Sequence, residues 1–261
     1  MSAGSIEFAE RTVSADGFEI RYWEAGTGPP LVCLHGAAGP RLGHAHARLA
    51  QAGHRVLLVE APGFGSSAVN ERSGSMVELA GTLLAACDAL GLERFAVWGT
   101  SFGGRLGLWL ALRAPERIET LVLVAPAAIL PGSIDPPTPD RIFHHPERLP
   151  PREPLSPEVD AKQRALVARL IPEPRDPDLE AGLAGLDVPT LVLWGTEDRA
   201  IPSSLGREYV ARMPRCRLML VYDAGHGIDG DRPEAFAAVV GDFLARGEAF
   251  VVPQSSGLLY P

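Results

Sequence analysis

The sequence predicts an α/β fold in which a mostly parallel sheet is covered by helices on both faces. Two kinds of apolar segment alternate along the chain: short runs rich in Val and Leu, and longer stretches with apolar residues at helical spacing. A strand buried on both faces is a near-continuous apolar run, and parallel strands need a crossover between them. A single proline-rich region interrupts this alternation, which predicts one insertion into an otherwise regular sheet.

The expected strands are short and apolar. An antiparallel hairpin is expected first, because residues 6–13 and 18–23 look extended and flank the turn sequence Asp16-Gly17. The buried strands that follow are expected at residues 31–34, 56–59, 95–98, 121–124, 191–194 and 218–222.

The longer segments have the spacing of amphipathic helices. In residues 76–92, five apolar side chains recur at intervals of three and four and form one stripe: Met76, Leu79, Leu83, Cys87 and Leu90. Further helices are expected at residues 105–113, 208–213 and 233–245.

Residues 127–187 break this alternation and hold 12 of the chain's 24 prolines. Proline at that density opposes continuous helix or central strand, so only residues 159–171 are expected to be helical. We interpret this region as a cap laid over the sheet; a flexible surface excursion is the alternative. The sheet domain then comprises residues 1–126 and 188–246, and residues 247–261 are expected to be a loose tail.

The composition excludes several classes of protein. The net charge of −8 opposes a nucleic-acid surface, which needs clustered Lys and Arg. Three cysteines that lie far apart predict neither a disulfide framework nor a zinc site. The first eleven residues lack the pattern of a signal peptide, and no apolar run approaches the ~20 residues of a membrane span. We expect a soluble, cytoplasmic protein.

The strongest chemical signal is the sequence Gly99-Thr100-Ser101-Phe102-Gly103, between an expected strand and an expected helix. A nucleophile at such a turn has a strained backbone, and its neighbours two before and two after must be nearly free of side chain. The helix that follows directs its N-terminal N–H groups toward the place where an oxyanion would form. Ser101 is therefore the candidate nucleophile.

A serine nucleophile needs a histidine base, and His226 is the candidate. It follows the strand expected at residues 218–222 and precedes the last helix, so it lies at the sheet edge where ligand groups gather. Five other histidines are interpreted as surface or cap residues: His44, His46, His54, His144 and His145. His44 and His46 have no third metal ligand at a usual spacing.

The base needs a carboxylate that holds its tautomer, and Asp198 is the candidate. It follows the strand at residues 191–194 and gives the chain order Ser, Asp, His. Glu197 is the adjacent competitor, and Asp223 is a second competitor close to His226.

Two backbone amides should form the oxyanion hole. Phe102 directly follows the nucleophile, and Ala37 lies in a loop of small residues after the strand at residues 31–34. His35 is expected to hold this loop by hydrogen bonding rather than to act as a base.

Taken together, these motifs resemble the α/β-hydrolase superfamily over residues 13–245. The segments that carry the resemblance are His35-Gly36, the run from Glu60 to Ser67, Gly99 to Gly104, Gly195 to Asp198, and Gly225-His226. The resemblance implies about eight strands, a cap after the sixth, a Ser101–Asp198–His226 triad, oxyanion donors at Ala37 and Phe102, and a monomer or homodimer. It implies no cofactor and no metal.

Differences from the motifs of particular branches of the superfamily narrow the range of expected functions. A serine nucleophile argues against the haloalkane dehalogenase and epoxide hydrolase branches, which use a carboxylate. The loop at residues 35–39 lacks the three glycines of hormone-sensitive-lipase-like enzymes. Gly227 stands where carbon–carbon bond hydrolases of aromatic degradation often carry a Trp.

Three functions remain open. The leading expectation is hydrolysis of a carboxylic ester or related acyl bond of a small molecule through an acyl-enzyme. The second is carbon–carbon bond hydrolysis of a vinylogous diketone, whose carboxylate could be held by Arg141, Arg164 or Arg169. The third is a non-catalytic member that binds a small ligand.

Overall fold

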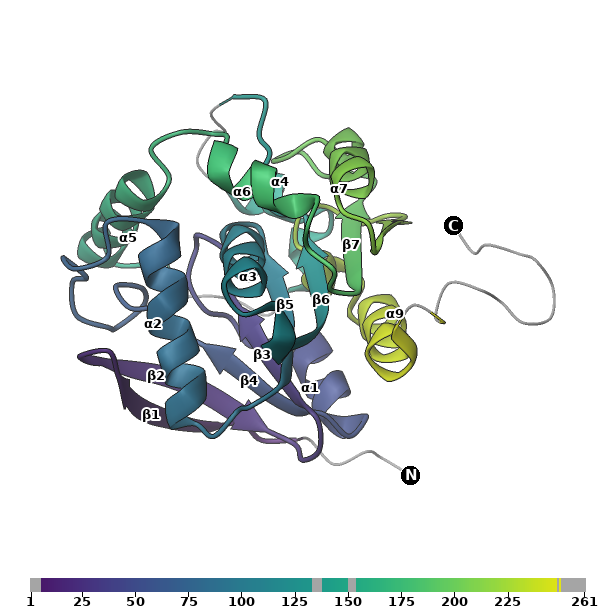
Figure 1. Ribbon diagram of the computed structural model, residues 1–261. Coiled ribbons are helices and arrows are strands. Elements are labelled where there is room, and N and C mark those ends of the chain that lie inside the picture. Colours follow the sequence, from purple (N-terminus) through teal and green to yellow (C-terminus); the bar gives the residue numbers. More distant parts are fainter. Residues whose placement is uncertain (1–5, 133–137, 150–153, 248, 250–261) are drawn as a thin grey trace.

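The computed structural model describes residues 6–132, 138–149, 154–247 and 249. An eight-stranded sheet in the order β1-β2-β4-β3-β5-β6-β7-β8 forms its centre (Figure 1). β1 pairs with β2, and β2 with β4, in antiparallel fashion, and every other pair is parallel. The predicted fold class is therefore confirmed. The strands are β1 (Ala9–Ala15), β2 (Phe18–Ala25), β3 (Pro30–Leu34), β4 (Arg55–Val59), β5 (Phe95–Thr100), β6 (Ile118–Val124), β7 (Thr190–Gly195) and β8 (Cys216–Val221).

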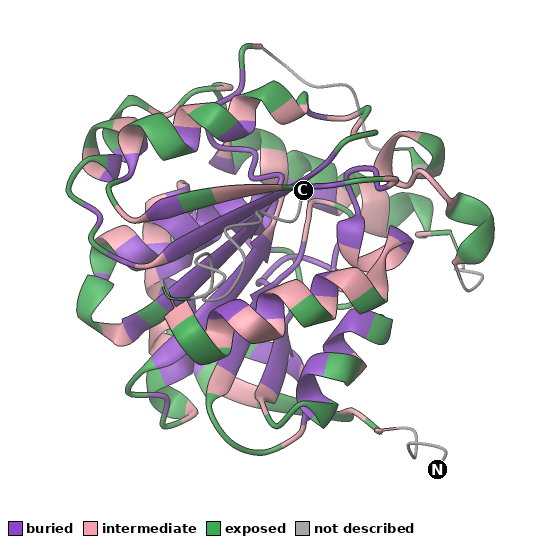
Figure 2. Ribbon diagram, turned by 90° about the vertical axis from the view of Figure 1, so that its right-hand side faces the viewer, coloured by how far each residue is buried: buried purple, intermediate pink, exposed green. Residues whose placement is uncertain are grey.

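Helices cover both faces of the sheet. α2 (Met76–Ala89) and α3 (Phe102–Arg113) pack on one face, and α1 (His44–Gln51) and α9 (Pro233–Arg246) pack on the other (Figure 1). Successive residues of β5 alternate between two cores: Phe95 and Val97 join the first, and Ala96 and Trp98 the second. Buried positions run along the strands, while the outer helices keep exposed stripes, as Figure 2 shows. Such two-sided burial explains the continuous apolar runs in the sequence.

The predicted hairpin and helices form for local reasons. Asp16 and Gly17 both have positive φ (47° and 72°), which suits a two-residue turn between antiparallel strands. α2 begins after Ser75, whose hydroxyl accepts a hydrogen bond from the Glu78 N–H at 3.2 Å. Pro233 is the first residue of α9. At this position a backbone N–H would have no partner within the helix, so proline, which lacks the N–H, costs no hydrogen bond.

The region between β6 and β7 contains more helix than the sequence analysis predicted. Besides α5 (Pro157–Leu170), it contains α4 (Pro139–Ile142), a 3₁₀ turn at Pro146–Arg148, and α6 (Pro177–Leu183). The expectation of one helix was wrong because each of these helices begins with a proline, the first-turn position at which proline is tolerated. The additional helices α4 and α6 are thus compatible with the proline count.

Buried polar contacts fix α6 to the sheet domain. The Asp176 carboxylate caps α6 by accepting from the Leu179 N–H at 3.1 Å. Its other oxygen accepts from Arg105 and Trp109 of α3, each at 3.1 Å. Arg105 is 3% exposed, so this ion pair is largely shielded from solvent. These contacts position part of the predicted cap above α3.

The remaining elements are α7 (Gly206–Arg212), α8 (Ile228–Asp231) and two 3₁₀ turns at Pro115–Arg117 and Ser203–Leu205. No helix among the described residues is long and apolar enough to cross a membrane. The expectation of a loose tail concerns residues 247–261, which lie almost wholly outside the described residues.

Candidate active site

Ser101 lies at the sharp turn between β5 and α3. Its φ is 54°, a left-handed conformation that costs a non-glycine residue roughly 1–3 kcal/mol. A Cβ added at Gly99 would lie 2.2 Å from the Gly103 carbonyl oxygen, and one added at Gly103 would lie 2.2 Å from that of Leu34. The two flanking glycines are therefore required by close backbone contact, as the sequence analysis predicted for a nucleophile turn.

His226 and Asp198 form a buried pair. His226 Nδ1 lies 2.9 Å from Asp198 Oδ2, and the two side chains are 5% and 0% exposed. The other carboxylate oxygen accepts from the N–H groups of Ala200 and Ile201 at 2.8 and 2.9 Å. Two backbone N–H groups hold Oδ1, which fixes the orientation of Asp198. Because a carboxylate only accepts hydrogen bonds, Oδ2 can fix the tautomer of His226 with the proton on Nδ1.

The two competing acids do not contact His226. Glu197 is exposed and contacts Thr196. Asp223 lies against His145, which keeps the pKa of its carboxyl below the usual value. The residue that the sequence analysis preferred, Asp198, is therefore the acid that the structure places beside His226.

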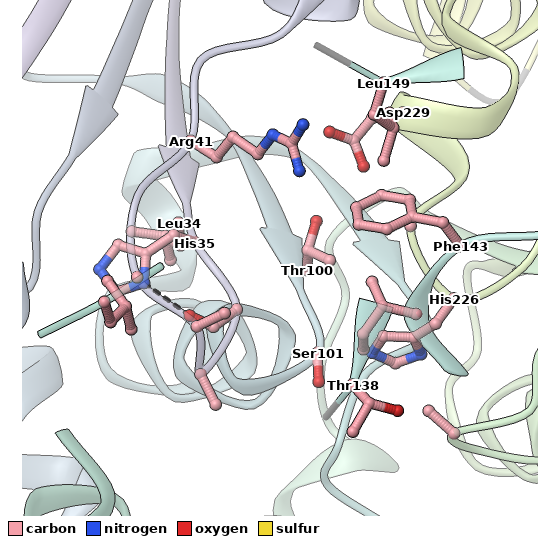
Figure 3. A pocket seen from close by; sticks show the side chains of 18 of the residues that line it. Leu34, His35, Arg41, Thr100, Ser101, Thr138, Phe143, Leu149, His226 and Asp229 are labelled. Carbon is pink, nitrogen blue, oxygen red and sulfur yellow. Dashed lines mark hydrogen bonds between the residues drawn. The ribbon is translucent and has the colours of Figure 1, made fainter. Parts of the chain in front are cut away.

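Ser101 and His226 line the same cavity of about 860 Å³. It lies between the carboxyl ends of the parallel strands and the region after β6, which contributes Thr138, Phe143 and Leu149 (Figure 3). Both residues are among the cavity-lining side chains labelled in Figure 3. This cavity is large enough for a small-molecule substrate.

The predicted oxyanion donors lie beside this site. Ala37 lines the cavity, and Phe102 is the first residue of α3, where a backbone N–H has no intrahelical acceptor. His35 behaves as expected: its Nδ1 lies 2.8 Å from the Gly36 carbonyl oxygen, and its Nε2 accepts from the Ala61 N–H at 3.1 Å. Both ring nitrogens are thus used to hold the loop that carries Ala37.

The interpretation of His46 as a surface or cap residue was wrong. Its side chain is buried, stacks on Trp98 with ring centroids 4.4 Å apart, and lines the cavity. Ala45, Leu49 and Ala50 are buried on the same face of α1, so helical spacing was the signal that could have placed it. Burial lowers the pKa of His46 to about 4, and the ring stays neutral at pH 7.

This pKa predicts acid sensitivity. The unfolded chain binds a proton near pH 6.5 and the folded chain only near pH 4, so falling pH favours unfolding across this interval. We expect His46 to account for about 3 kcal/mol of stability lost between neutral pH and pH 4. In urea unfolding at both pH values, His46→Gln should lack this component, while His44→Gln, an exposed change on the same helix, should retain it. Equal pH dependence in all three proteins would refute the assignment.

Three cavity residues were missed by the sequence analysis. Arg41, Phe143 and Asp229 line the cavity, and the Arg41 guanidinium lies 5.4 Å from the centre of the Phe143 ring. Figure 3 shows Arg41 and Asp229 pointing toward one another. Loss of solvent raises the pKa of Asp229, and the nearby positive charge of Arg41 opposes this effect.

The three arginines proposed as carboxylate ligands do not line the cavity. Arg141 donates to the Arg199 carbonyl oxygen, and Arg164 pairs with Asp160 on the same helix. Arg169 donates to two backbone carbonyl oxygens, those of Ser73 and Asn70. These side chains hold the region after β6 together or fix it to the sheet domain, so none of the three is placed to bind a substrate carboxylate in the cavity.

The presence of glycine at position 227 has a steric explanation in this chain. A Cβ at this position would lie 2.3 Å from the Phe143 ring, so Phe143 occupies the space of a side chain at residue 227. The Gly227 N–H also donates to the Ile142 carbonyl oxygen at 2.8 Å. The loop after His226 is therefore covered by a side chain from another segment.

A strained serine turn, a buried histidine–carboxylate pair at the carboxyl ends of parallel strands and an insertion after β6 together define a class of hydrolases. Two family profiles match the chain: "alpha/beta hydrolase fold" over residues 29–151 and "TAP-like protein" over residues 163–251. The chain belongs to the α/β-hydrolase superfamily.

Sequence and structure comparisons find proteins similar to this chain. A 2-hydroxy-6-oxononadienedioate/2-hydroxy-6-oxononatrienedioate hydrolase of Burkholderia vietnamiensis is 31% identical, covering 90% of this chain and 94% of that protein. A solved 2-hydroxy-6-oxo-6-phenylhexa-2,4-dienoate hydrolase of a Rhodococcus strain is 22% identical with a TM-score of 0.73, covering 92% and 100%. A solved bacterial membrane phospholipase A is 23% identical with a TM-score of 0.75, covering 91% and 86%. At such identities the two solved structures establish the fold alone.

Proposed function

We propose that this hydrolase cleaves a carbon–carbon bond in a small vinylogous diketone that carries a carboxylate. The observation that carries the proposal is one cavity lined by Ser101, by His226, whose Nδ1 contacts Asp198, and by a cation, Arg41. The name of the relative that is 31% identical over most of both chains supports this bond class over the ester that the sequence analysis placed first.

In this proposal the residues act in sequence. His226 accepts the Ser101 proton, and Ser101 Oγ attacks the ketone carbon while the amides of Ala37 and Phe102 bind the oxyanion. The adjacent carbon–carbon bond then breaks, and conjugation to the second ketone spreads the charge of the departing carbon. His226 returns its proton to that carbon, and water deprotonated by His226 releases the acid from Ser101. Of the residues that act in these steps, Ser101, His226 and Ala37 line the cavity, and Phe102 directly follows Ser101.

In this proposal Arg41 binds the substrate carboxylate, a role that the sequence analysis considered for three arginines of the cap. Among the described residues that line the cavity, Arg41 is the only arginine. It faces the Asp229 carboxyl, whose pKa is raised by loss of solvent. A substrate carboxylate could displace Asp229 from the guanidinium, since the charged form of Asp229 is disfavoured there. An arginine binds a carboxylate with two parallel hydrogen bonds, which fixes substrate orientation.

Substitution of Arg41 tests this assignment. We expect Arg41→Gln to raise KM for a carboxylate-bearing diketone by about 10–100-fold, because a charge-assisted hydrogen bond contributes about 1.5–3 kcal/mol. KM for a neutral ester should change little. Arg141→Gln, which removes an arginine outside the cavity wall, should match the unchanged protein on both substrates. An equal KM increase for both substrates would assign Arg41 to cavity structure instead.

The same groups could cleave an ester, and Gly227 favours that second candidate because aromatic-degradation hydrolases often carry Trp there. The two are separated by comparing kcat/KM for coloured ring-fission diketones, followed spectrophotometrically, with kcat/KM for p-nitrophenyl esters of increasing acyl length. The proposal predicts that a diketone exceeds every ester at least about tenfold, a difference of 1.4 kcal/mol in transition-state stabilisation. Faster turnover of an ester would establish the second candidate.

A further inference from the structure

Two consecutive histidines and a carboxylate from a distant part of the chain meet outside the catalytic cavity. Asp223 Oδ1 lies 2.9 Å from His145 Nε2 and 3.4 Å from His144 Nε2. One ligand atom from each residue falls within 4.8 Å of the other two, and all three side chains are partly buried. The three residues come from the segment between α4 and the 3₁₀ turn at Pro146–Arg148, and from the loop after β8.

The spacing fits a tetrahedral ion. Zinc binds imidazole nitrogen and carboxylate oxygen at about 2.0–2.2 Å, which places neighbouring ligand atoms about 3.3 Å apart. The two measured separations, 2.9 and 3.4 Å, lie close to that value. The ligand atoms of the two histidines lie within 4.8 Å of one another, and side-chain movement that shortens this separation would complete a first coordination sphere.

The backbone of the histidine pair is held by a buried carboxylate. Asp231 accepts hydrogen bonds from the N–H groups of His144 and His145, both at 2.9 Å, and from that of Gly225 at 2.8 Å. Asp231 is 5% exposed. The histidines are therefore fixed relative to the loop that carries Asp223, whether or not a ligand is bound.

The surrounding charges also suit a cation. His145 Nδ1 lies 3.4 Å from a Glu147 carboxylate oxygen, an outer contact of the kind that orients metal-binding histidines. Arg232 lies 3.6 Å from Asp223, but against Oδ2, and Oδ1 faces the two histidines.

We propose that His144, His145 and Asp223 form a binding site for a divalent transition-metal ion of the zinc class. Such ions accept imidazole and carboxylate together, and three protein ligands leave a position for water. The ion would join the segment after β6 to the loop that reaches His226 three residues later. No such site was expected from the sequence, because Asp223 lies 78 residues beyond His145.

The test uses the full chain without a histidine tag, freed of metal with a chelator. Zn²⁺ binding is measured by titration calorimetry, and Co²⁺ binding by its visible absorption, which reports coordination number. We expect one ion per chain and a Tm that rises with Zn²⁺, because a ligand that binds only the folded state stabilises it. Removing an outer contact weakens metal sites about 10–100-fold, so loss of a direct ligand in His145→Ala or Asp223→Asn should weaken binding at least about 100-fold.

His44→Ala, which removes an exposed histidine outside the cluster, is the matched control and should bind like the unchanged chain. The conservative Asp223→Asn, at a partly buried position, guards against misfolding of His145→Ala, and far-ultraviolet circular dichroism of metal-free proteins verifies the fold. Absence of saturable binding, or equal binding in both ligand variants and the control, would overturn the proposal. These readouts measure binding, so they stand apart from the catalytic proposal.

Discussion

Replacing Ser101 by Ala is expected to lower kcat by about 10⁶-fold on diketone and ester alike. The change removes the attacking oxygen and leaves the turn intact, because Ala fits wherever the Ser side chain fits. Weak residual turnover should persist, since the amides of Ala37 and Phe102 would still bind the oxyanion. Single-turnover and steady-state kinetics on both substrate classes measure the effect.

Ser204→Ala is the matched control for this variant. Ser204 is exposed and lies outside the cavity wall, so its removal should leave kcat within about twofold of the unchanged protein. Both variants should unfold at similar urea concentrations. If Ser101→Ala retained more than a small fraction of the activity, the nucleophile would have to be another group.

Asp198→Asn should lower kcat by about 10⁴-fold while the fold persists. The N–H groups of Ala200 and Ile201 both donate to Oδ1, so an asparagine must place its carbonyl oxygen there. Its NH₂ group then points at His226 Nδ1, which has to become an acceptor. The proton moves to Nε2, and that nitrogen can no longer accept the Ser101 proton.

The pH profile distinguishes this effect from simple loss of packing. If the wrong tautomer is the cause, activity should recover in part at alkaline pH, where the Ser101 hydroxyl ionises without a base. Glu197→Gln, one residue away and exposed, should behave like the unchanged protein. A small effect of Asp198→Asn, or a large one of Glu197→Gln, would contradict the assigned acid.

The candidate catalytic residues could be chosen from the sequence because their signals are local. Ser101, Asp198 and His226 each follow a strand, and the carboxyl ends of parallel strands meet at one edge of the sheet. The requirement for Gly99 and Gly103 is likewise set by contacts within one strand–turn–helix unit and its neighbouring strand.

The rest of the cavity depends on contacts that no local pattern encodes. Arg41 and Asp229 are 188 residues apart in the sequence. They come together because α8, which carries Asp229, contacts α1, which begins three residues after Arg41. Phe143 belongs to a proline-rich segment and contacts the loop after His226. His145, two residues further along the same segment, contacts Asp223. Sequence motifs could not decide between ester hydrolysis and carbon–carbon bond hydrolysis either, since both reactions use the same triad.

The most direct test of the account is covalent labelling of the purified protein with a fluorophosphonate, followed by intact mass measurement and peptide mapping. Such a probe reports a serine that a base has activated, whichever bond the enzyme cleaves. The account predicts one label per chain on Ser101, absent in Ser101→Ala and slowed by orders of magnitude in His226→Ala. Labelling of another residue, or no labelling of the folded protein, would contradict the claim that Ser101, His226 and Asp198 form a working catalytic unit.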